Sequence, residues 1–485
     1  MSPAVIGLDV GTSATKGIAL DSDGTVLARA EVPYPLSTPR PGWSEQDPED
    51  WWRASEAVLA QLRRETGEPA GIGLSGQMHG LVALDSADRV LRPAILWNDQ
   101  RTAAECDRIE QTLGAERLIE LTGNRALTGF TAPKLLWIRE NEPQIHERIA
   151  HLLLPKDYVR LRRPGEPPTA PAAPPGPLGR YGAARRWSDE VLAGLAVDAA
   201  WLPRVLESPE PSGTTRTGAI PVAAGAGDQA AGALGVGVVR PGEALSVVLG
   251  TSGVVFAATD GFAPDPHGRV HAFAHAVPGA WHTMGVVLSA AGSLSWLRDA
   301  IAPDSGFADL VTAAESWPPG TENLRFLPYL AGERTPHADP DARGAFTGLS
   351  LRHDRGALVR AVLEGVAFAL RDALDLVGAD PGVVGRVSGG GARSELWLRI
   401  LASVLEIELE RPAADEGAAF GAALLGGVAA GVWADAREAV AATVRPAGAR
   451  VEPVPAWVNP YREAHARYRG LYPALRDARP LSGDS

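Results

Sequence analysis

The fold of this chain is decided by the stretch VIGLDVGTSATKGIAL, residues 5–20. Apolar, β-rich runs lie on both sides of the turn residues Gly-Thr-Ser at 11–13, and this pattern is typical of two strands joined by a hairpin. The turn DSDG at 21–24 then predicts a third strand over 25–30. Next, Asp47 and Pro48 have the residue types of a helix N-cap and first helical position. The sequence therefore opens with a β-meander followed by a helix.

The same turn recurs in the second half of the chain. The stretch SVVLGTSGVVF at 246–256 places Gly250, Thr251 and Ser252 between apolar runs, as at 11–13. We expect two related lobes that each carry a hairpin, divided near Arg240 into residues 1–240 and 241–485. Helical spacing over 354–376 and 394–405, with a strand pattern over 383–387, predicts an α/β architecture.

Composition narrows the class of protein. The 485 residues carry a formal charge of −12, which argues against a nucleic-acid partner and against electrostatic binding to a membrane. The lone Cys106 and the absence of a signal-peptide pattern favour the cytoplasm. The uncharged stretch 417–434 has the length of a membrane span, but it consists mainly of alanine and glycine. We therefore predict a buried helix that packs closely on its neighbours.

Glycine turns between strands suit phosphate, because bare backbone N–H groups approach anionic oxygens closely. The chain has three candidate phosphate turns, although none has the Walker A pattern: 11–13, 250–252 and the glycines at 389–391, which precede a predicted helix. Asp9 ends the first strand, where it could hold a hydrated Mg²⁺ or simply serve the turn.

Polar residues among glycines form a second group of candidates. Asp228, in AGAGDQAAGALGVG, is placed either as a general base toward a substrate hydroxyl or as the N-cap of a helix beginning at Gln229. GLSGQMHG at 73–80 and WNDQR at 97–101 suggest a polar pocket wall suited to a polyol. The histidines at 267, 271 and 275 suggest zinc, but the alternation of RVHAFAHAV over 269–277 favours a strand instead, and we reject the metal.

Taken together, these motifs resemble the FGGY carbohydrate-kinase family. The resemblance covers nearly the whole chain and extends to further stretches: GWSEQDPEDWW (42–52), FTAPKLLW (130–137), LLPKDY (153–158), LPYLAGERTPH (327–337) and GGGARSELW (389–397). Within that family, GQMHG and WNDQR favour xylulose over glycerol or gluconate as the sugar.

The resemblance implies two ribonuclease-H-like domains of the actin-like ATPase class, with ATP, Mg²⁺ and a small sugar bound in the cleft between them. It implies that Asp228 is the catalytic base and that Asp9 serves Mg²⁺, through water, and phosphate. Met78 and His79 would bind the sugar, together with Gln229, which stands where asparagine is frequent in the family. The implied nucleotide-binding residues are Gly11, Thr12, Ser13, Lys16, Gly250, Thr251, Ser252, Gly390 and Gly391.

Several alternatives stay open at this point. The chain could be a kinase for another ketose or polyol, a sugar-independent ATPase of the same fold, or a sugar-binding module; a homodimer is possible. The stretch 164–186, with seven prolines between Pro164 and Pro177, departs from the family pattern. We interpret it as the product of two compensating frameshifts, which resequencing and peptide mass spectrometry across 160–190 would test.

Overall fold

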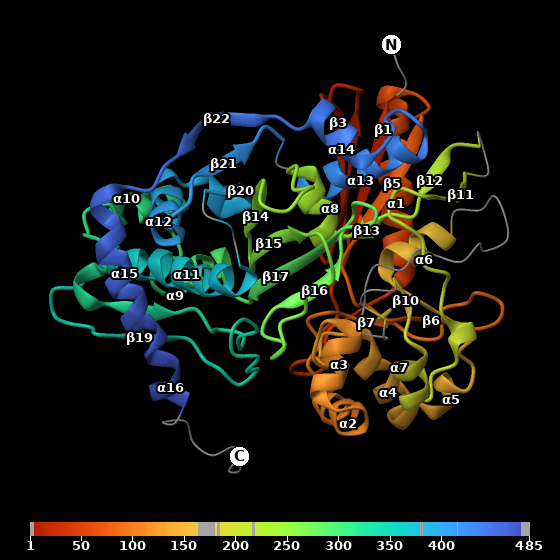
Figure 1. Cartoon of the computed structure of the whole chain (residues 1–485), viewed down its shortest axis with the longest axis horizontal. Coiled ribbons are helices and arrows are strands. Elements are labelled where there is room, and N and C mark those ends of the chain that lie inside the picture. Colours follow the sequence, from red (N-terminus) through yellow and green to blue (C-terminus); the bar gives the residue numbers. More distant parts are fainter. Residues whose placement is uncertain are drawn as a thin grey trace. The chain divides into compact units, whose positions relative to one another are not determined.

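The computed structural model describes residues 4–162, 180–181, 185–215, 219–378, 380, 382–414 and 416–476. Most of the segment 164–186, and the frameshift hypothesis with it, lies outside these residues. The chain forms two compact units (Figure 1). The first unit contains residues 1–241, 258–282 and 416–445, and the second contains 242–257, 283–415 and 446–485. Two segments from the second half of the chain therefore pack with the first unit, which a single division after residue 240 does not describe.

The first unit is a mixed α/β body. Its strands are β1 Val5–Val10, β2 Ala14–Leu20, β3 Val26–Pro33, β4 Glu45–Gln46, β5 Gly71–Gly76, β6 Val82–Leu84, β7 Ala94–Ile95, β8 His151–Leu153, β9 Arg180–Tyr181, β10 Arg186–Trp187, β11 Pro211–Thr214, β12 Pro221–Ala223, β13 Ala226–Gly227 and β16 His271–Ala274. Its helices are α1 Pro48–Thr66, α2 Ala103–Leu113, α3 Ala115–Thr122, α4 Thr131–Asn141, α5 Pro143–His146, α6 Pro155–Leu161, α7 Asp189–Gly194, α8 Asp228–Gly235, α13 Gly417–Ala429 and α14 Ala436–Thr443, with a 3₁₀ turn at Ala199–Trp201.

The predicted meander is confirmed. β1, β2 and β3 pair antiparallel, and β1 also pairs in parallel with β5, so that the main sheet has the order β11–β12–β5–β1–β2–β3, with β13 also beside β5. The predicted helix start is confirmed as well, since the side chain of Asp47 accepts a hydrogen bond from the backbone N–H of Glu49 and Pro48 is the first residue of α1. Trp51, Val58 and Leu62 are the apolar residues by which α1 is buried in the core of this unit.

Helix α13 lies against β1 and β5 (Figure 1), although more than 300 residues separate it from them in the sequence. A Cβ on Gly73 would come 1.7 Å from the carbonyl oxygen of Ala422, and one on Gly7 would come 2.0 Å from that of Ala419. Glycine is required at these positions because the helix backbone approaches the strand backbone directly. The predicted close-packed helix is thus confirmed, and no helix of the described residues is long and apolar enough to cross a membrane.

The second unit repeats the plan of the first. Its strands are β14 Ala244–Leu249, β15 Gly253–Thr259, β17 Trp281–Val287, β18 Arg325–Leu327, β19 Ala345–Thr347, β20 Val384–Ser388, β21 Leu409–Pro412 and β22 Pro446–Val451. Its helices are α9 Ala291–Ile301, α10 Phe307–Ala314, α11 Arg355–Val377, α12 Glu395–Leu405, α15 Pro455–Arg469 and α16 Leu471–Arg476, with 3₁₀ turns at Thr321–Asn323 and Gly390–Arg393. β14 pairs antiparallel with β15 and parallel with β20, as β1 does with β2 and β5. The predicted elements over 354–376, 383–387 and 394–405 correspond to α11, β20 and α12.

Candidate active site

Three parallel strands of the first unit bring the candidate residues to one edge of the sheet. Asp9 of β1 lies opposite Ser75 of β5, and Ser75 lies opposite Ala226 of β13. Parallel strands with aligned registers end at the same edge, and neighbouring strands lie about 4.8 Å apart. The residues at the ends of these strands, Asp9, the segment 77–79 and Asp228, are therefore gathered together. The sequence named these residues, but the register that assembles them is visible only in the structure.

Asp228 is the first residue of α8, directly after β13. The predicted N-cap role is wrong by one position, since Gly227 occupies the cap and Asp228 is the first helical residue. Its Oδ1 accepts a 2.8 Å hydrogen bond from the backbone N–H of Gln229, the second helical residue. Burial, and after it the negative charge of Asp9, raises the pKa of Asp228 to about 7. A carboxyl group with this pKa can accept a proton near neutral pH and is much more basic than an exposed aspartate.

Asp9 is a half-buried carboxyl group that is suited to a cation. Burial raises its pKa, while the neighbouring Ser75 and the positive charge of Lys16, opposite it on β2, act to lower that pKa. Its Oδ1 is buried without a hydrogen-bond partner among the described residues. These residues contain no group of three or more His, Cys, Asp or Glu side chains that could hold a metal. The unpartnered Oδ1 of Asp9 is an oxygen of the kind that binds Mg²⁺, a cation that usually keeps several of its waters in protein sites.

The predicted sugar-binding pair follows β5. Met78 and His79 are buried, and His79 has a φ of 70°, which is unusual for a residue other than glycine. Its carbonyl oxygen accepts hydrogen bonds from Lys134 Nζ at 2.8 Å and from Thr131 Oγ1 at 3.2 Å. Its ring packs against Phe130, with the ring centres 4.4 Å apart. Helix α4, through Thr131 and Lys134, thus holds this strained position.

The first glycine turn is held through its carbonyl groups. The carbonyl oxygen of Gly11 accepts hydrogen bonds from Tyr34 Oη at 2.6 Å and Gln77 Nε2 at 3.1 Å. That of Thr12 accepts one from Gln46 Nε2 at 2.6 Å. Gly11 and Thr12 are half-buried, Ser13 is exposed, and Lys16 extends from β2 as an exposed cation. Gln46 and Tyr34 were not among the residues predicted for the site, although Gln46 lies in the GWSEQDPEDWW stretch that carries the family resemblance.

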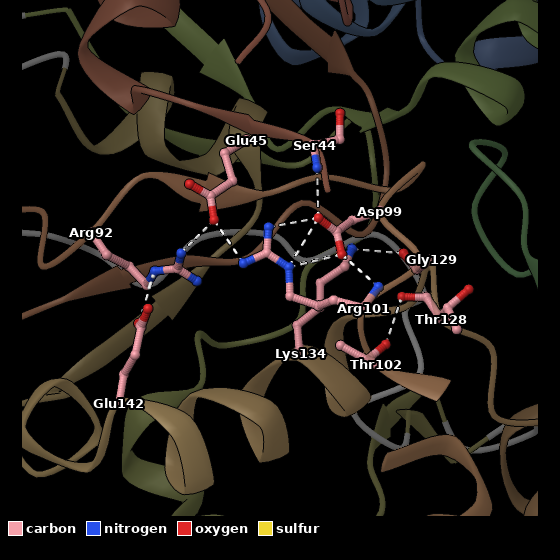
Figure 2. Close-up of polar contacts among 10 residues, drawn as sticks. All are labelled: Ser44, Glu45, Arg92, Asp99, Arg101, Thr102, Thr128, Gly129, Lys134 and Glu142. Carbon is pink, nitrogen blue, oxygen red and sulfur yellow. Dashed lines mark hydrogen bonds and ion pairs between the residues drawn. The ribbon is translucent and has the colours of Figure 1, made fainter. Parts of the chain in front are cut away.

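The WNDQR stretch is only partly the pocket wall that the sequence suggested. Asp99 and Arg101 have side-chain exposures of 0% and 1% and pair with each other at 2.7 Å, and Arg101 also pairs with Glu45 at 2.7 Å (Figure 2). Glu45 also pairs with Arg92, and Arg92 in turn pairs with Glu142 (Figure 2). These side chains are therefore structural. Trp97 instead donates its indole N–H to Thr12 Oγ1 at 2.9 Å, which links this loop to the glycine turn.

The second unit carries the other two predicted turns. The carbonyl oxygens of Gly250 and Thr251 accept 2.8 Å hydrogen bonds from the backbone N–H groups of Ala291 and Ala290, at the start of α9. Gly390 is open, since a Cβ there would meet nothing within 4 Å, whereas Gly391 is buried. The helix predicted from Ser394 is present, with Ser394 as the N-cap of α12, and a 3₁₀ turn over Gly390–Arg393 separates the glycines from its N-terminus.

Among the histidines of the rejected zinc site, His271 begins β16, which covers the middle of the strand predicted over 269–277. His275 follows that strand directly, and His267 lies before it. His271 Nδ1 forms a 2.7 Å hydrogen bond with Asn124 Oδ1, and His275 Nε2 one of 3.0 Å with the carbonyl oxygen of Val238. Both rings are buried, and burial lowers the pKa of His275 to about 4. These two histidines therefore have structural partners.

The two units, each with a strand–turn–strand hairpin beside a parallel strand, place the chain in the class of two-domain actin-like ATPase folds. The model of the N-terminal domain of the FGGY family of carbohydrate kinases matches residues 4–235, and that of the C-terminal domain matches 245–430. The chain belongs to the FGGY family of carbohydrate kinases.

Similar proteins support this assignment. The xylulose kinase of Escherichia coli (strain K12) is 44% identical over 439 residues, which cover 88% of this chain and 90% of that protein. The xylulose kinase of Bacillus subtilis (strain 168) is 37% identical and covers 98% of this chain and 97% of its own length. The crystal structure of xylulose kinase from Rhodospirillum rubrum has a TM-score of 0.88 at 33% identity and covers 98% of this chain and 99% of that one.

Proposed function

We propose that this carbohydrate kinase transfers the γ-phosphoryl group of ATP to D-xylulose and forms D-xylulose 5-phosphate. The observation that carries the proposal is the half-buried carboxyl group of Asp228, whose pKa is raised to about 7 at the sheet edge that also carries Asp9 and His79. The choice of sugar is supported by relatives of 37% and 44% identity that are xylulose kinases.

In the proposed reaction, Asp228 accepts the proton of the terminal sugar hydroxyl, and the oxygen of that hydroxyl attacks the γ-phosphorus of ATP. The bond from that phosphorus to the bridging oxygen breaks, and ADP leaves. Transfers of this kind depend mainly on alignment and on stabilisation of the phosphate charge. Three residues would orient the sugar: Met78 and His79, which follow the end of β5, and Gln229, in the first turn of α8.

The phosphate groups would meet the hairpin residues Gly11, Thr12 and Ser13, with Lys16 as a nearby cation. In the second unit, Gly250, Thr251 and Ser252 would bind phosphate, and Gly390 and Gly391 would contact the nucleotide. Bound Mg²⁺ would offset phosphate charge, and Asp9 would hold it through water, as the unpartnered Oδ1 of Asp9 suggests.

An ADP-release assay with D-xylulose, D-ribulose, glycerol, gluconate and no sugar tests this proposal. We expect D-xylulose to give kcat/KM at least about tenfold above the other sugars. Preference for another sugar would identify a different ketose or polyol kinase. Equal ADP release without sugar would identify a sugar-independent ATPase.

A further inference from the structure

The two glycine hairpins are held in different ways. In the second unit, the carbonyl oxygens of the turn accept hydrogen bonds from backbone N–H groups at the start of α9. Such bonds do not depend on which side chains α9 carries at these positions. In the first unit, side chains hold the carbonyl oxygens of Gly11 and Thr12, and two of these side chains are the glutamines Gln46 and Gln77. The position of the first hairpin therefore depends on the identity of particular residues.

The two glutamines form one hydrogen-bonded chain whose direction is fixed. The indole N–H of Trp51 can only donate, and it donates to Gln46 Oε1 at 3.0 Å. The amide N–H₂ of Gln46 must then face the carbonyl oxygens of Thr12 and Pro35, at 2.6 and 3.2 Å. Gln77 Nε2 donates to the same Gln46 Oε1 at 3.1 Å and also to the carbonyl oxygen of Gly11. No flipped amide satisfies these contacts.

Holding a carbonyl group also aims the N–H group of the next residue. In a trans peptide unit, C=O and N–H point in opposite directions within one plane. Because the carbonyl groups of Gly11 and Thr12 point at Gln77 and Gln46, the N–H groups of Thr12 and Ser13 point away from the glutamines. These N–H groups are the ones that a phosphate would need. The glutamines are buried, with exposures of 3% for Gln46 and 2% for Gln77, and they contact the turn on the side opposite to these N–H groups.

Gln77 also connects the turn to the sugar-binding segment. Its backbone N–H donates to the carbonyl oxygen of Val10 at 2.8 Å, and it immediately precedes Met78 and His79. A single residue thus contacts the phosphate hairpin with its side chain and leads the chain into the sugar-binding pair.

We propose that Gln46 and Gln77 are positioning residues that aim the backbone N–H groups of the first hairpin at the nucleotide phosphates. This role rests on the proposed use of ATP. Neither glutamine is required to touch the sugar or the reacting atoms. Loss of either amide should therefore weaken binding of the nucleotide much more than binding of the sugar.

Isothermal titration with the magnesium complex of a non-hydrolysable ATP analogue, and separately with D-xylulose, tests this proposal in the full chain. For Gln77→Met and for Gln46→Met we expect Kd for the analogue to rise about tenfold, with Kd for the sugar changed less than about twofold. The double variant should lose less than the product of the two single losses, because the two amides share a hydrogen bond. Gln111→Met, on the exposed face of α2, is the matched control and should change neither Kd.

Two further measurements keep the outcomes distinct. If a glutamine variant does not fold, as judged by thermal unfolding, Tyr34→Phe removes another donor to Gly11 and should raise Kd for the analogue in the same direction. A nucleotide affinity within about twofold of the parent in these variants, or equal losses for sugar and nucleotide, would overturn the proposal. Failure of the parent to bind the analogue would overturn it too. A parent that binds the analogue but phosphorylates no sugar would refute the proposed function alone.

Discussion

Asp228 lies two strands away from Asp9 at the same edge of one sheet, and burial together with the negative charge of Asp9 raises the pKa of Asp228 to about 7. Across β5, two strand spacings separate their backbones by about 10 Å. At that distance, a partly buried charge still acts on its neighbour. Two carboxyl groups with different properties therefore lie at one edge of the sheet: Asp9 has an oxygen without a hydrogen-bond partner among the described residues, and Asp228 has a pKa of about 7.

The first prediction concerns the dependence of the reaction on pH. Because the base must be deprotonated, kcat/KM for the sugar should fall about tenfold per pH unit below pH 7, the pKa of Asp228, and level off above it. Initial rates of ADP release between pH 5 and 9, at saturating ATP, would measure this. A flat profile down to pH 5 would show that no group of this pKa limits the reaction.

The second prediction is that Asp228→Asn is inactive but more stable at alkaline pH. A carboxyl group whose pKa is higher in the folded state destabilises the fold as pH rises from about 4 through 7, since the unfolded chain releases the proton more easily. Asparagine removes this cost, which we expect to be about 1–3 kcal/mol because the side chain is only half-buried. Thermal unfolding at pH 8 should show a higher Tm for the variant, and at pH 4 the difference should shrink. An equal Tm difference at both pH values would contradict the shifted pKa.

A third prediction addresses Lys134, which has 0% exposure and donates to the carbonyl oxygens of His79 and Gly129 at 2.8 and 2.7 Å. Lys134→Met keeps the apolar stem but removes both donations at the strained His79. We expect KM for the sugar to rise about tenfold or more, with KM for ATP much less affected. Steady-state kinetics with each substrate varied would separate the two effects. Equal increases in both KM values would indicate general damage to the fold instead.

Fourth, the contact between α13 and β5 should not tolerate even one methyl group. In Gly73→Ala, the new Cβ would lie 1.7 Å from the carbonyl oxygen of Ala422, so the backbones must separate. We expect a loss of at least about 3 kcal/mol, measured by urea unfolding, or failure to fold. Gly261→Ala is the control, because a Cβ there meets nothing within 4 Å, and its stability should match the parent.

The fifth prediction concerns the buried ion network of Figure 2. Asp99→Ala removes one carboxylate partner of Arg101, at 2.7 Å, and the acceptor for the backbone N–H of Ser44, at 2.6 Å, while the pair of Arg101 with Glu45 remains. The guanidinium of Arg101 then loses part of its compensating charge in a buried site, and we expect about 3 kcal/mol of destabilisation. The exposed pair Arg298–Asp299 offers a control, since Asp299→Ala should cost less than about 1 kcal/mol. Equal effects in urea unfolding would show that the buried network contributes no more than a surface pair.

Local patterns predicted the elements around the site well. The hairpins at 11–13 and 250–252, the cap at Asp47 and the strand before 389 all depend on residues close in sequence, and the structure has each of them. The cap at Asp228 was wrong by one residue, because Gly227 supplies the extended backbone that starts α8. Such a shift depends on the pairing of β13 with β5, which no local pattern contains.

The partners of residues that are far apart in the sequence could not be predicted either, because local patterns do not show which distant segments come together. Nothing in WNDQR distinguishes Asp99 and Arg101 in a buried ion pair from side chains that face a ligand. The association of 416–445 with the first unit depends on backbone contacts of glycine, which leave no side-chain pattern to match. The bond from Gln46 to the turn at Thr12 likewise spans 34 residues and involves a backbone oxygen.

The place of α13 also has a consequence for biosynthesis. Because β1 and β5 are covered by a helix at residues 417–429, the first unit cannot be completed until more than four-fifths of the chain has left the ribosome. A nascent chain that ends near residue 240 would expose the glycine-lined face of this sheet. During synthesis, the sheet that contains β1 and β5 therefore remains incompletely packed until α13 has been translated.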